Sequence, residues 1–290
     1  MKKLVLLALT VFVMTMFSQI PEMILVKGGS FKMGSEDGKK NEKPVHTVKL
    51  NDFYISKYEV KISEFLDFLM DYEKVDFKKT KRYAKFNKDG ELTLLRSKVA
   101  DDHQCAMYWV NWYLAVDYCN WLSEKAGFEQ CYTVDGKDID CDFTADGFRL
   151  LTEAEWEYAT RGGISSKGYM YSGSNDHDKV AWTKENTKKI QVVGLKAPNE
   201  LGIYDMSGNV SEMCWDSFDS DYYKDSVSEN PTGPKRKSNK VIRGGSWKDK
   251  AKFATNTSRK YNAVFDKDKD LGIRIGRSVK AEVKEEVKTW

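Results

Sequence analysis

The chain has 290 residues, of which 41% are hydrophobic and 13% aromatic. This composition provides enough apolar surface for one large core and argues against an intrinsically disordered protein. The formal net charge is +3. Such a nearly balanced charge gives no reason to expect nucleic acid or an anionic membrane surface as a partner.

Residues 1–18 have the pattern of a secretory signal peptide. Two lysines form a basic start, and the apolar stretch that follows, residues 4–17, is short for a membrane span. Cleavage is expected after Ser18, with an uncleaved N-terminal anchor as the alternative. No cysteine occurs before Cys105, which argues against a lipid-anchored cysteine near the signal. The mature protein is therefore expected to be secreted or periplasmic, without a membrane span.

The first part of the chain predicts three strands and a helix. Strands are expected at 23–26, 30–33 and 47–55, where apolar residues alternate or cluster between glycines. Residues 61–70 carry apolar side chains at helical spacing and predict an amphipathic helix. The Lys- and Asp-rich segment that follows, 71–103, is expected to be a surface insertion.

Two more helices are predicted from their end signals. Asn111 is a suitable N-cap for a helix that Gly127 would end. Thr152 and Glu155 have the spacing of a capping box, which predicts a short third helix ending at a Gly-Gly pair.

Beyond residue 165 the sequence has little helical periodicity. Strands are expected at 240–242 and 271–275 among loops and turns. No linker rich in Gly, Ser or Pro divides the chain, so one domain is expected over residues 22–278. Residues 279–290 are expected to be a loosely held tail.

Five cysteines in an exported protein allow two disulfides and one free thiol. Cys131 and Cys141 are the best pair, because a three-residue loop around the glycine between them would place them opposite each other in a hairpin. Cys119 falls on the inner side of the second helix and is expected to be a buried free thiol. Cys105 and Cys214 could also pair, but their spacing does not decide it.

No catalytic constellation is evident from the residues. His46, His103 and His177 do not have the spacing of metal ligands. Ser246 follows two glycines, but the Gly-x-Ser-x-Gly element of a nucleophilic serine is absent. A set of catalytic residues is therefore not predicted.

Several charged residues are better explained by structure than by catalysis. Arg243 and Arg274 are expected to be buried and to contact acidic or carbonyl groups. Glu153, Glu155 and Glu157 crowd the start of the third helix, where their charges favour the helix dipole.

Most tryptophans are expected in the core rather than in a sugar-binding platform, because they fall in helix or motif segments. Trp182 is the exception, since it lies in a polar loop. The tryptophans expected in the core are Trp109, Trp112, Trp121, Trp156, Trp215 and Trp247.

Four segments carry long, specific motifs: Phe-Lys-Met-Gly at 31–34, Gly-Phe-Arg-Leu-Leu-Thr-Glu-Ala-Glu-Trp-Glu at 147–157, Tyr-Asp-Met-Ser-Gly-Asn-Val-Ser-Glu at 204–212 and Val-Ile-Arg-Gly-Gly-Ser-Trp at 241–247. In this order they resemble the sulfatase-modifying factor family, which is named for the formylglycine-generating enzyme. The resemblance covers most of residues 23–277. It implies a C-type-lectin-like α+β fold with two main helices, small twisted sheets and extensive irregular loops.

The resemblance also implies where a copper site would lie. In the active enzymes, two cysteines after the Gly-Gly-Ser-Trp element hold copper(I) and perform the oxidation. The corresponding positions here are Asp249 and Ala254, and no cysteine follows Cys214. Because copper(I) selects soft thiolate ligands, neither copper binding nor formylglycine generation is expected.

A structural calcium site is the second implication of the resemblance. Its ligands would be the Asp205 side chain, the backbone carbonyls of Gly208 and Val210, and the Glu212 carboxylate. Calcium prefers such oxygen ligands, and two carboxylates would balance its charge. The alternative is a loop held by hydrogen bonds from its own Asp and Asn side chains.

Three classes of function remain open. The first is an exported, non-catalytic protein that binds a protein, peptide or glycan or takes part in envelope assembly. The second is an oxidoreductase of the formylglycine-generating type with displaced or unrecognised ligands. The third is a purely structural part of a cell-envelope or surface machine. Fold alone does not decide among them, because function on such scaffolds lies in the loops.

Overall fold

The computed structural model describes residues 20–71, 84–86, 92–94, 99–235 and 238–280. The predicted signal at 1–18 and most of the predicted tail lie outside these residues. None of the helices in the described ranges combines the length and the apolar character that a bilayer crossing needs.

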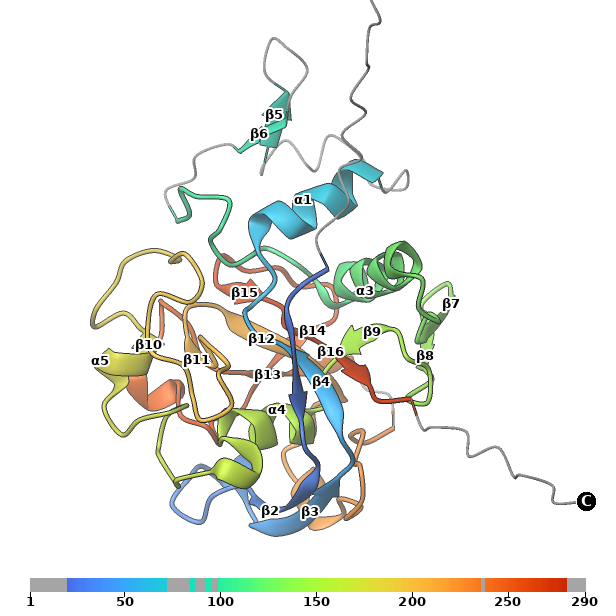
Figure 1. The fold of residues 1–290 in the computed structure, drawn as a ribbon. Coiled ribbons are helices and arrows are strands. Elements are labelled where there is room, and N and C mark those ends of the chain that lie inside the picture. Colours follow the sequence, from blue (N-terminus) through green and yellow to red (C-terminus); the bar gives the residue numbers. More distant parts are fainter. Residues whose placement is uncertain (1–19, 72–83, 87–91, 95–98, 236–237, 281–290) are drawn as a thin grey trace, which may run out of the picture.

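Two four-stranded sheets organise the chain (Figure 1). The strands of the first sheet, in spatial order, are β1 (Met23–Val26), β4 (Phe53–Ser56), β16 (Ile275–Ser278) and β9 (Phe148–Leu150). The strands of the second are β14 (Lys260–Ala263), β13 (Asn239–Arg243), β12 (Ser211–Ser217) and β15 (Leu271–Gly272). Strands from distant parts of the sequence pair in both sheets, so their order ties the two halves of the chain together.

Smaller elements surround these sheets. The two-stranded pairs are β2 (Gly29–Met33) with β3 (His46–Leu50), β5 (Ala84–Phe86) with β6 (Leu92–Leu94), β7 (Tyr132–Asp135) with β8 (Asp138–Cys141), and β10 (Ala181–Trp182) with β11 (Ser207–Gly208). The α-helices are α1 (Ile62–Asp71), α3 (Trp112–Ala126), α4 (Glu153–Thr160) and α5 (His177–Val180). In Figure 1, the two longer helices, α1 and α3, lie together at one end of the sheets, and α4 lies beneath β12 and β13. The predicted α+β class with two main helices and small sheets is confirmed.

The helix ends follow the predicted signals. The Asn111 side chain accepts a hydrogen bond from the Leu114 amide at 3.0 Å at the start of α3, and Gly127 ends it with a φ of 73°. At the start of α4, Thr152 and Glu155 form both hydrogen bonds of the capping box. Cap chemistry is local, so sequence was sufficient to place these ends.

Two predicted strands are each divided in the structure. The single strand predicted at 47–55 is β3 and β4, which belong to different sheets. Between them the Asn51 amide donates to Asn230 at 2.8 Å, and Asp52 accepts from the Gly28 amide at 2.8 Å. The strand predicted at 271–275 is likewise divided into β15 and β16, with the buried Arg274 between them. Contacts with segments far away in sequence cause both interruptions. The residue pattern within one strand does not reveal such contacts.

The hairpin predicted around Gly136 is present as β7 and β8, but its register differs from the prediction. Tyr132, not Cys131, lies opposite Cys141, and the loop has two residues rather than three. Successive strand residues point to opposite faces, so this shift assigns Cys131 and Cys141 to different faces of the hairpin. Both thiols are free.

The other three cysteines are also free. Cys119 is fully buried on α3, as predicted. Cys105 and Cys214 are buried in two different clusters of the core, so the possible pairing between them is not formed.

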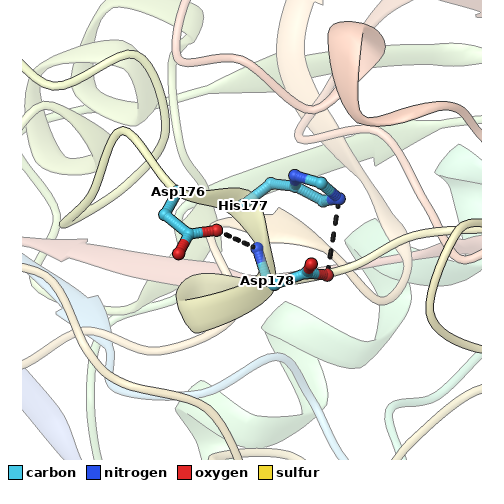
Figure 2. Close-up of side chains that lie close together, drawn as sticks. All are labelled: Asp176, His177 and Asp178. Carbon is cyan, nitrogen blue, oxygen red and sulfur yellow. Dashed lines mark hydrogen bonds and ion pairs between the residues drawn. The ribbon is translucent and has the colours of Figure 1, made fainter.

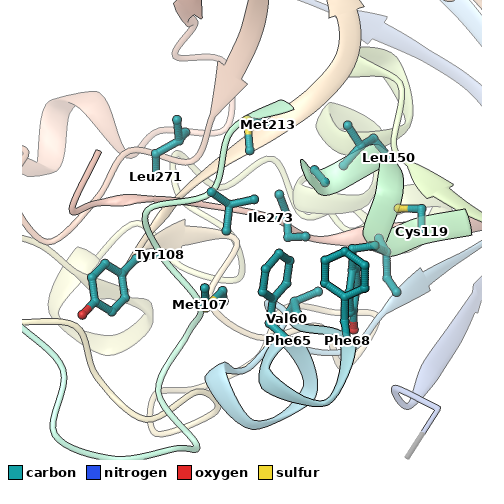
Figure 3. Packing of buried hydrophobic residues seen from close by; sticks show 14 of the residues in the cluster. Val60, Phe65, Phe68, Met107, Tyr108, Cys119, Leu150, Met213, Leu271 and Ile273 are labelled. Atoms are coloured by element: carbon teal, nitrogen blue, oxygen red, sulfur yellow. The ribbon is translucent and has the colours of Figure 1, made fainter. Parts of the chain in front are cut away.

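The larger of these clusters lies between the two long helices and the sheets (Figure 3). Phe65 and Phe68 of α1 pack on Tyr118 of α3, with ring centroids 5.0 and 5.6 Å apart. Ile273 is fully buried in the same cluster. The second cluster surrounds Trp156 of α4. Helix α4 is therefore a central element rather than a surface helix.

The three glutamates of α4 are buried and each meets an arginine, which for Glu153 and Glu157 comes from a distant segment. Glu153 accepts two hydrogen bonds from Arg259, at 2.6 and 2.8 Å. Glu155 accepts two from Arg149, at 2.7 and 2.8 Å. The prediction that these glutamates mainly favour the helix dipole missed this role. Arg149 lies six residues before Glu155, but Arg259 lies 106 residues after Glu153.

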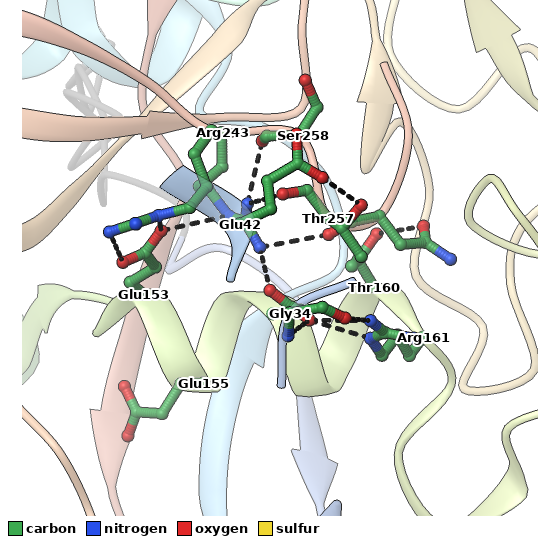
Figure 4. A network of polar contacts seen from close by, with 12 residues as sticks. Gly34, Glu42, Glu153, Glu155, Thr160, Arg161, Arg243, Thr257 and Ser258 are labelled. Carbon is green, nitrogen blue, oxygen red and sulfur yellow. Dashed lines mark hydrogen bonds and ion pairs between the residues drawn. The ribbon is translucent and has the colours of Figure 1, made fainter. Parts of the chain in front are cut away.

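Glu157 contacts Gly34, Arg161 and Arg243, which are labelled in the polar network of Figure 4. It forms an ion pair with Arg243, accepts from Arg161 at 2.9 and 3.0 Å, and accepts from the Gly34 amide at 2.8 Å. Burial raises the pKa of Glu157, but Arg243 and Arg161 outweigh this effect, so the pKa lies below its usual value.

The predicted burial of Arg243 with acidic and carbonyl partners is confirmed. Besides Glu157, its guanidinium donates to the carbonyls of Asn256, Thr257 and Ser258 at 2.7–3.1 Å. This set of acceptors offsets part of the cost of removing the charge from water.

We expect Glu157→Gln to lower the free energy of unfolding by about 3–5 kcal/mol, because it removes the nearer of the two buried carboxylates that face Arg243 and leaves only Glu153 at 3.7 Å. Chemical denaturation monitored by circular dichroism measures the change. Asp221→Asn is the control: it removes one partner of the exposed Lys224–Asp221 pair and should cost less than about 1 kcal/mol. Equal losses in the two variants would contradict the structural role of the buried network.

Candidate functional site

The segment from Asp205 to Glu212, called the Asp205–Glu212 loop here, contains β11 and the start of the central strand β12. Three of its residues have a left-handed backbone, Asp205 with a φ of 58°, Gly208 with a φ of 82° and Asn209 with a φ of 54°. A Cβ on Gly208 would lie 2.3 Å from the Trp182 carbonyl oxygen, so glycine is required where β11 pairs with β10. This tight turn buries the whole predicted ligand set.

Asp205 has the least satisfied side chain of the loop. Its Oδ2 accepts a hydrogen bond from the Gly194 amide at 2.6 Å, whereas its buried Oδ1 has no hydrogen-bond partner. Burial raises the pKa of Asp205 to about 6. A buried carboxylate oxygen without a donor is unfavourable unless a proton or a cation meets it.

Both carboxylate oxygens of Glu212 already accept a hydrogen bond. Its Oε2 accepts from the Trp156 indole at 2.6 Å, and its Oε1 accepts from the Arg274 guanidinium at 2.8 Å. Each oxygen keeps a second lone pair, so a cation could still be bound. The main role that this geometry gives Glu212 is that of counter-ion to Arg274.

Glu59 is a third buried acid at this loop, and the sequence analysis missed it. Its carboxylate accepts from the Asn209 side chain at 2.6 Å and from the Val210 amide at 3.0 Å. Burial raises its pKa well above the usual value, and the charges of Asp205 and Glu212 raise it further. The signal that could have revealed it is an acidic residue followed directly by Val60 at the start of a buried segment.

Three buried carboxylates, on Glu59, Asp205 and Glu212, therefore surround one buried guanidinium, that of Arg274. When ionised, they carry an excess of two negative charges over that arginine. A divalent cation would balance this excess of charge. Glu59 is not one of the predicted ligands but places a third buried carboxylate beside them.

The positions expected for copper ligands hold a different chemistry. Asp249 accepts a hydrogen bond from the Ser246 hydroxyl at 2.9 Å and forms an ion pair with Lys260. Ala254 is fully buried and has no ligand atom on its side chain. Hard oxygen and a methyl group do not fit copper(I).

Further charges extend this polar cluster. The Ser246 hydroxyl also lies 2.7 Å from Asp270, and Lys248 donates to both Asp268 and Asp270, at 2.7 and 2.6 Å. Burial is the main cause of the raised pKa of Asp270. Ser246 is thus held by two carboxylates rather than by a histidine that could activate it.

Asp176, His177 and Asp178 bring three ligand-type side chains together at the start of α5 (Figure 2). Asp176 accepts from the Asp178 amide at 3.1 Å and caps the helix. The His177 imidazole lies 3.5 Å from Asp178 and packs against Tyr171. Both carboxylates are exposed, and their contacts within the cluster explain the arrangement without a metal.

A family model described as the sulfatase-modifying factor enzyme 1-like domain matches residues 11–279. The chain belongs to the sulfatase-modifying factor family. This confirms the predicted family and agrees with the lectin-like fold class.

Several relatives support the assignment. The chain is 32% identical to a protein named chaperone protein LppX from Paenibacillus barcinonensis, over 89% of each chain. It is 29% identical to serine/threonine-protein kinase pkn1 from Chlamydia pneumoniae, over 79% of this chain but 33% of that protein. It is 27% identical to the formylglycine-generating enzyme of Streptomyces coelicolor, over 77% of this chain and 78% of the enzyme.

Among solved structures, Treponema denticola variable protein 1 superposes with a TM-score of 0.73 at 28% identity, covering 89% of this chain and 95% of that one. The family therefore includes proteins with quite different names on one scaffold. The residues at the site, and not the fold, have to decide what this member does.

Proposed function

We propose that this protein is an exported, non-catalytic member of the family that acts as a binding or envelope-assembly protein. The observation that carries the proposal is the chemistry at Asp249 and Ala254. These residues follow the Gly-Gly-Ser-Trp element at the places where the active enzymes have cysteines, and they offer an ion-paired carboxylate and a methyl group. Oxygen activation by copper(I) has no thiolate ligand there.

The class of partner is inferred from the names of the relatives and from the loop surfaces of the fold. A relative that aligns with 89% of the chain is named a chaperone protein, which supports binding of a protein or peptide. A glycan is the other class of ligand that such loop surfaces accommodate. The basic and apolar start of the sequence supports export to the periplasm or the exterior.

We also propose that calcium stabilises the scaffold. Asp205, Gly208, Val210 and Glu212 are the proposed ligands, and Glu59 supplies the third buried negative charge at the loop. The unpartnered Asp205 oxygen and the excess of carboxylates support this proposal. A bound calcium ion would supply positive charge where protonation of Asp205 otherwise relieves the repulsion.

Calcium is expected to raise the melting temperature at pH 7.5, because it binds only the folded form; at 100 times Kd the gain is about 2.7 kcal/mol. Asp205→Asn should abolish the gain, whereas the control Asp176→Asn, at an exposed cap, should keep it. Glu212→Ala is unsuitable, because it would leave Arg274 buried without a counter-ion. A melting curve of the parent protein that does not respond to calcium would refute the calcium site.

The Asp205→Asn variant also tests how the stability of the protein depends on pH. The folded pKa of Asp205, about 6, exceeds its ordinary value of 3.8, so the calcium-free protein should lose stability as pH rises through this window. Calcium competes with that proton, and its stabilising effect should therefore decline below about pH 6. Thermal melts from pH 4 to 8, with and without calcium, measure both trends: the fall in stability of the calcium-free protein as pH rises, and the decline of calcium stabilisation below about pH 6.

The non-catalytic assignment predicts that no aldehyde forms when the protein is incubated with copper(I) and a cysteine-containing sulfatase-type peptide. Mass spectrometry of the peptide checks this. The double variant Asp249→Cys, Ala254→Cys should bind copper(I) far more tightly in competition with a chelator, because it restores two soft ligands. Its control, Asp249→Ser with Ala254→Ser, should not. Copper-dependent aldehyde formation by the parent protein would overturn the proposal.

The binding assignment predicts a protein partner outside the cytoplasm. A membrane-impermeant, amine-reactive cross-linker applied to intact cells of the native host should join the protein to that partner, which mass spectrometry then identifies. A chain lacking residues 1–18 should stay inside the cell and escape the reagent. Absence of any adduct, or retention of the parent chain in the cytoplasm, would count against this role.

A further inference from the structure

Two adjoining cavities share Thr232 in their linings. One, of about 260 Å³, is lined mainly by polar residues, among them Asn51 and Asn230, and is called the polar cavity here. The other, of about 330 Å³, has Tyr113 and Phe265 in its lining and is called the aromatic cavity. Neither lining contains a residue of the proposed calcium site or of the positions expected for copper ligands, so the two cavities are separate from both.

Two accessible rings lie in the aromatic cavity. The ring centroids of Tyr113 and Phe265 are 5.1 Å apart, and their planes meet at 37°. Phe265 is 58% exposed, and Tyr113 is half-buried. Trp112 and Trp215 are less available to a ligand, because the Lys240 ammonium lies 4.0 and 4.8 Å from their ring centroids. Tyr113 and Phe265 therefore form the aromatic surface that a ligand can reach.

Asn230 holds a fixed side-chain amide at the polar cavity. Its backbone has a left-handed φ of 43°, and its backbone N–H donates to the Lys49 carbonyl at 2.9 Å. Its side-chain oxygen accepts from the Asn51 backbone amide at 2.8 Å, whereas its NH₂ group has no acceptor among the residues that the structure describes. The side chains of Asn51 and Thr232 likewise have no hydrogen-bond partner in the described ranges. The polar cavity thus offers donors and acceptors to a ligand, and one of them is already held in place.

The charged residues of the polar cavity are paired with one another or with a neighbour. Arg149 and Glu155 form a buried ion pair at 2.7 Å. Asp52 pairs with Lys27 at 2.8 Å. Because these charges already have partners, the polar cavity suits an uncharged ligand that forms hydrogen bonds better than it suits an ion.

We propose that the two cavities together bind a neutral oligosaccharide. A sugar ring has C–H groups on its faces and hydroxyl groups around its edge, so it packs on an aromatic ring and forms hydrogen bonds at its rim. One ring of the chain lies on Tyr113 and Phe265, and another forms hydrogen bonds with Asn51, Asn230 and Thr232. This inference rests on the proposed binding function and assigns the glycan class of ligand to a defined site.

The nearby strand edges favour a sugar over a polypeptide. An extended peptide binds readily where a strand edge is open to backbone pairing. Near the polar cavity, the Lys49 amide of β3 already donates to the Ser228 carbonyl at 2.7 Å. Near the aromatic cavity, the Ala263 amide of β14 donates to the Asn262 side chain at 3.1 Å, and its carbonyl accepts from the Asp266 amide at 3.0 Å. These backbone groups are not available to an incoming strand.

Isothermal titration calorimetry on the full-length protein tests the proposal. The probes are chitotetraose and cellotetraose, two neutral tetrasaccharides whose rings have flat C–H faces. At least one of them should bind with a Kd below about 1 mM. It should also bind at least about tenfold more tightly than its monosaccharide, because a single ring reaches only one cavity at a time.

Two variants test the two cavities, and each has a matched control. Phe265→Ala removes an exposed ring, and Asn230→Asp removes the NH₂ donor while keeping the oxygen that accepts from Asn51. Each should weaken binding of the tetrasaccharide by about fivefold or more. Tyr261→Ala removes a ring that is 57% exposed outside both linings, and Asn175→Asp changes an exposed side chain that also accepts a backbone N–H. Both controls should keep the affinity of the parent protein, and thermal melts confirm that all four variants fold.

The other outcomes would overturn the proposal. They are no binding of either tetrasaccharide by the parent protein, and unchanged affinity in Phe265→Ala or in Asn230→Asp. Tighter binding of a tetramer of β-1,4-linked glucuronic acid removes the neutral sugar as ligand. Tighter binding of the peptide acetyl-Gly-Ser-Phe-Ser-Gly-amide assigns the aromatic cavity to a polypeptide. If a tetrasaccharide binds as expected while cross-linking captures no protein in cells, the sugar site stands and only the role with a protein partner fails.

Discussion

The arrangement of this protein depends on the buried ion pairs that connect α4 to the rest of the chain. Its three glutamates meet Arg149, on the strand just before the helix, and Arg243 and Arg259, which come from the C-terminal part of the chain. Burying these charges is costly, and it is tolerated because nearly every guanidinium meets a carboxylate and carbonyl groups at good geometry. In folds with longer strands, ladders of backbone hydrogen bonds hold neighbouring segments together. This fold has short strands and long loops, and the buried ion pairs hold the segments instead.

The Asp205–Glu212 loop differs from α4 in how its buried carboxylates are paired with arginines. Around α4, each carboxylate has its own arginine. Around the loop, Glu59, Asp205 and Glu212 share the buried Arg274, and the Asp205 oxygen lacks a donor. The two regions meet at Trp156, which belongs to α4 and donates to Glu212. A network of paired charges thus holds one side of a loop whose carboxylates outnumber its arginine, and this imbalance is the basis of the proposed calcium site.

Local chemistry was sufficient to predict part of this structure. The ends of α3 and α4 follow from Asn111, Gly127 and the Thr152 capping box, since each cap depends on neighbours along the chain. The family motifs located the loop and the altered copper positions. Register and pairing were not predictable in the same way. The register of the hairpin around Gly136 differs by one residue from the predicted one, which separates Cys131 from Cys141. The observed register places Val134 opposite Ile139 and Tyr132 opposite Cys141, so the apolar residues of the two alternating strands share a face.

The residues that the sequence analysis missed share one property: their partners in the structure lie far from them in sequence. Glu59 is meaningful only beside Asp205, and Lys240 only between the rings of Trp112 and Trp215. The prediction that Trp112 and Trp215 are core residues is right for Trp112, which is buried in the larger cluster, whereas Trp215 is partly buried against it. The prediction is also incomplete, because both residues line a cavity of about 330 Å³. A single residue pattern reports burial but not which side of a side chain remains accessible.

Strand β14 connects the surroundings of Asp249 with the cavity that Phe265 lines. Lys260, at its start, forms the ion pair with Asp249, and Phe265 follows its end and lines the cavity. Neither Asp249 nor Ala254 takes part in the α4 network, although Ala254 is itself fully buried. The proposed absence of copper chemistry therefore leaves the ion pairs around α4 unchanged, and Asp249 contributes to the scaffold through its pair with Lys260 at the start of the edge strand.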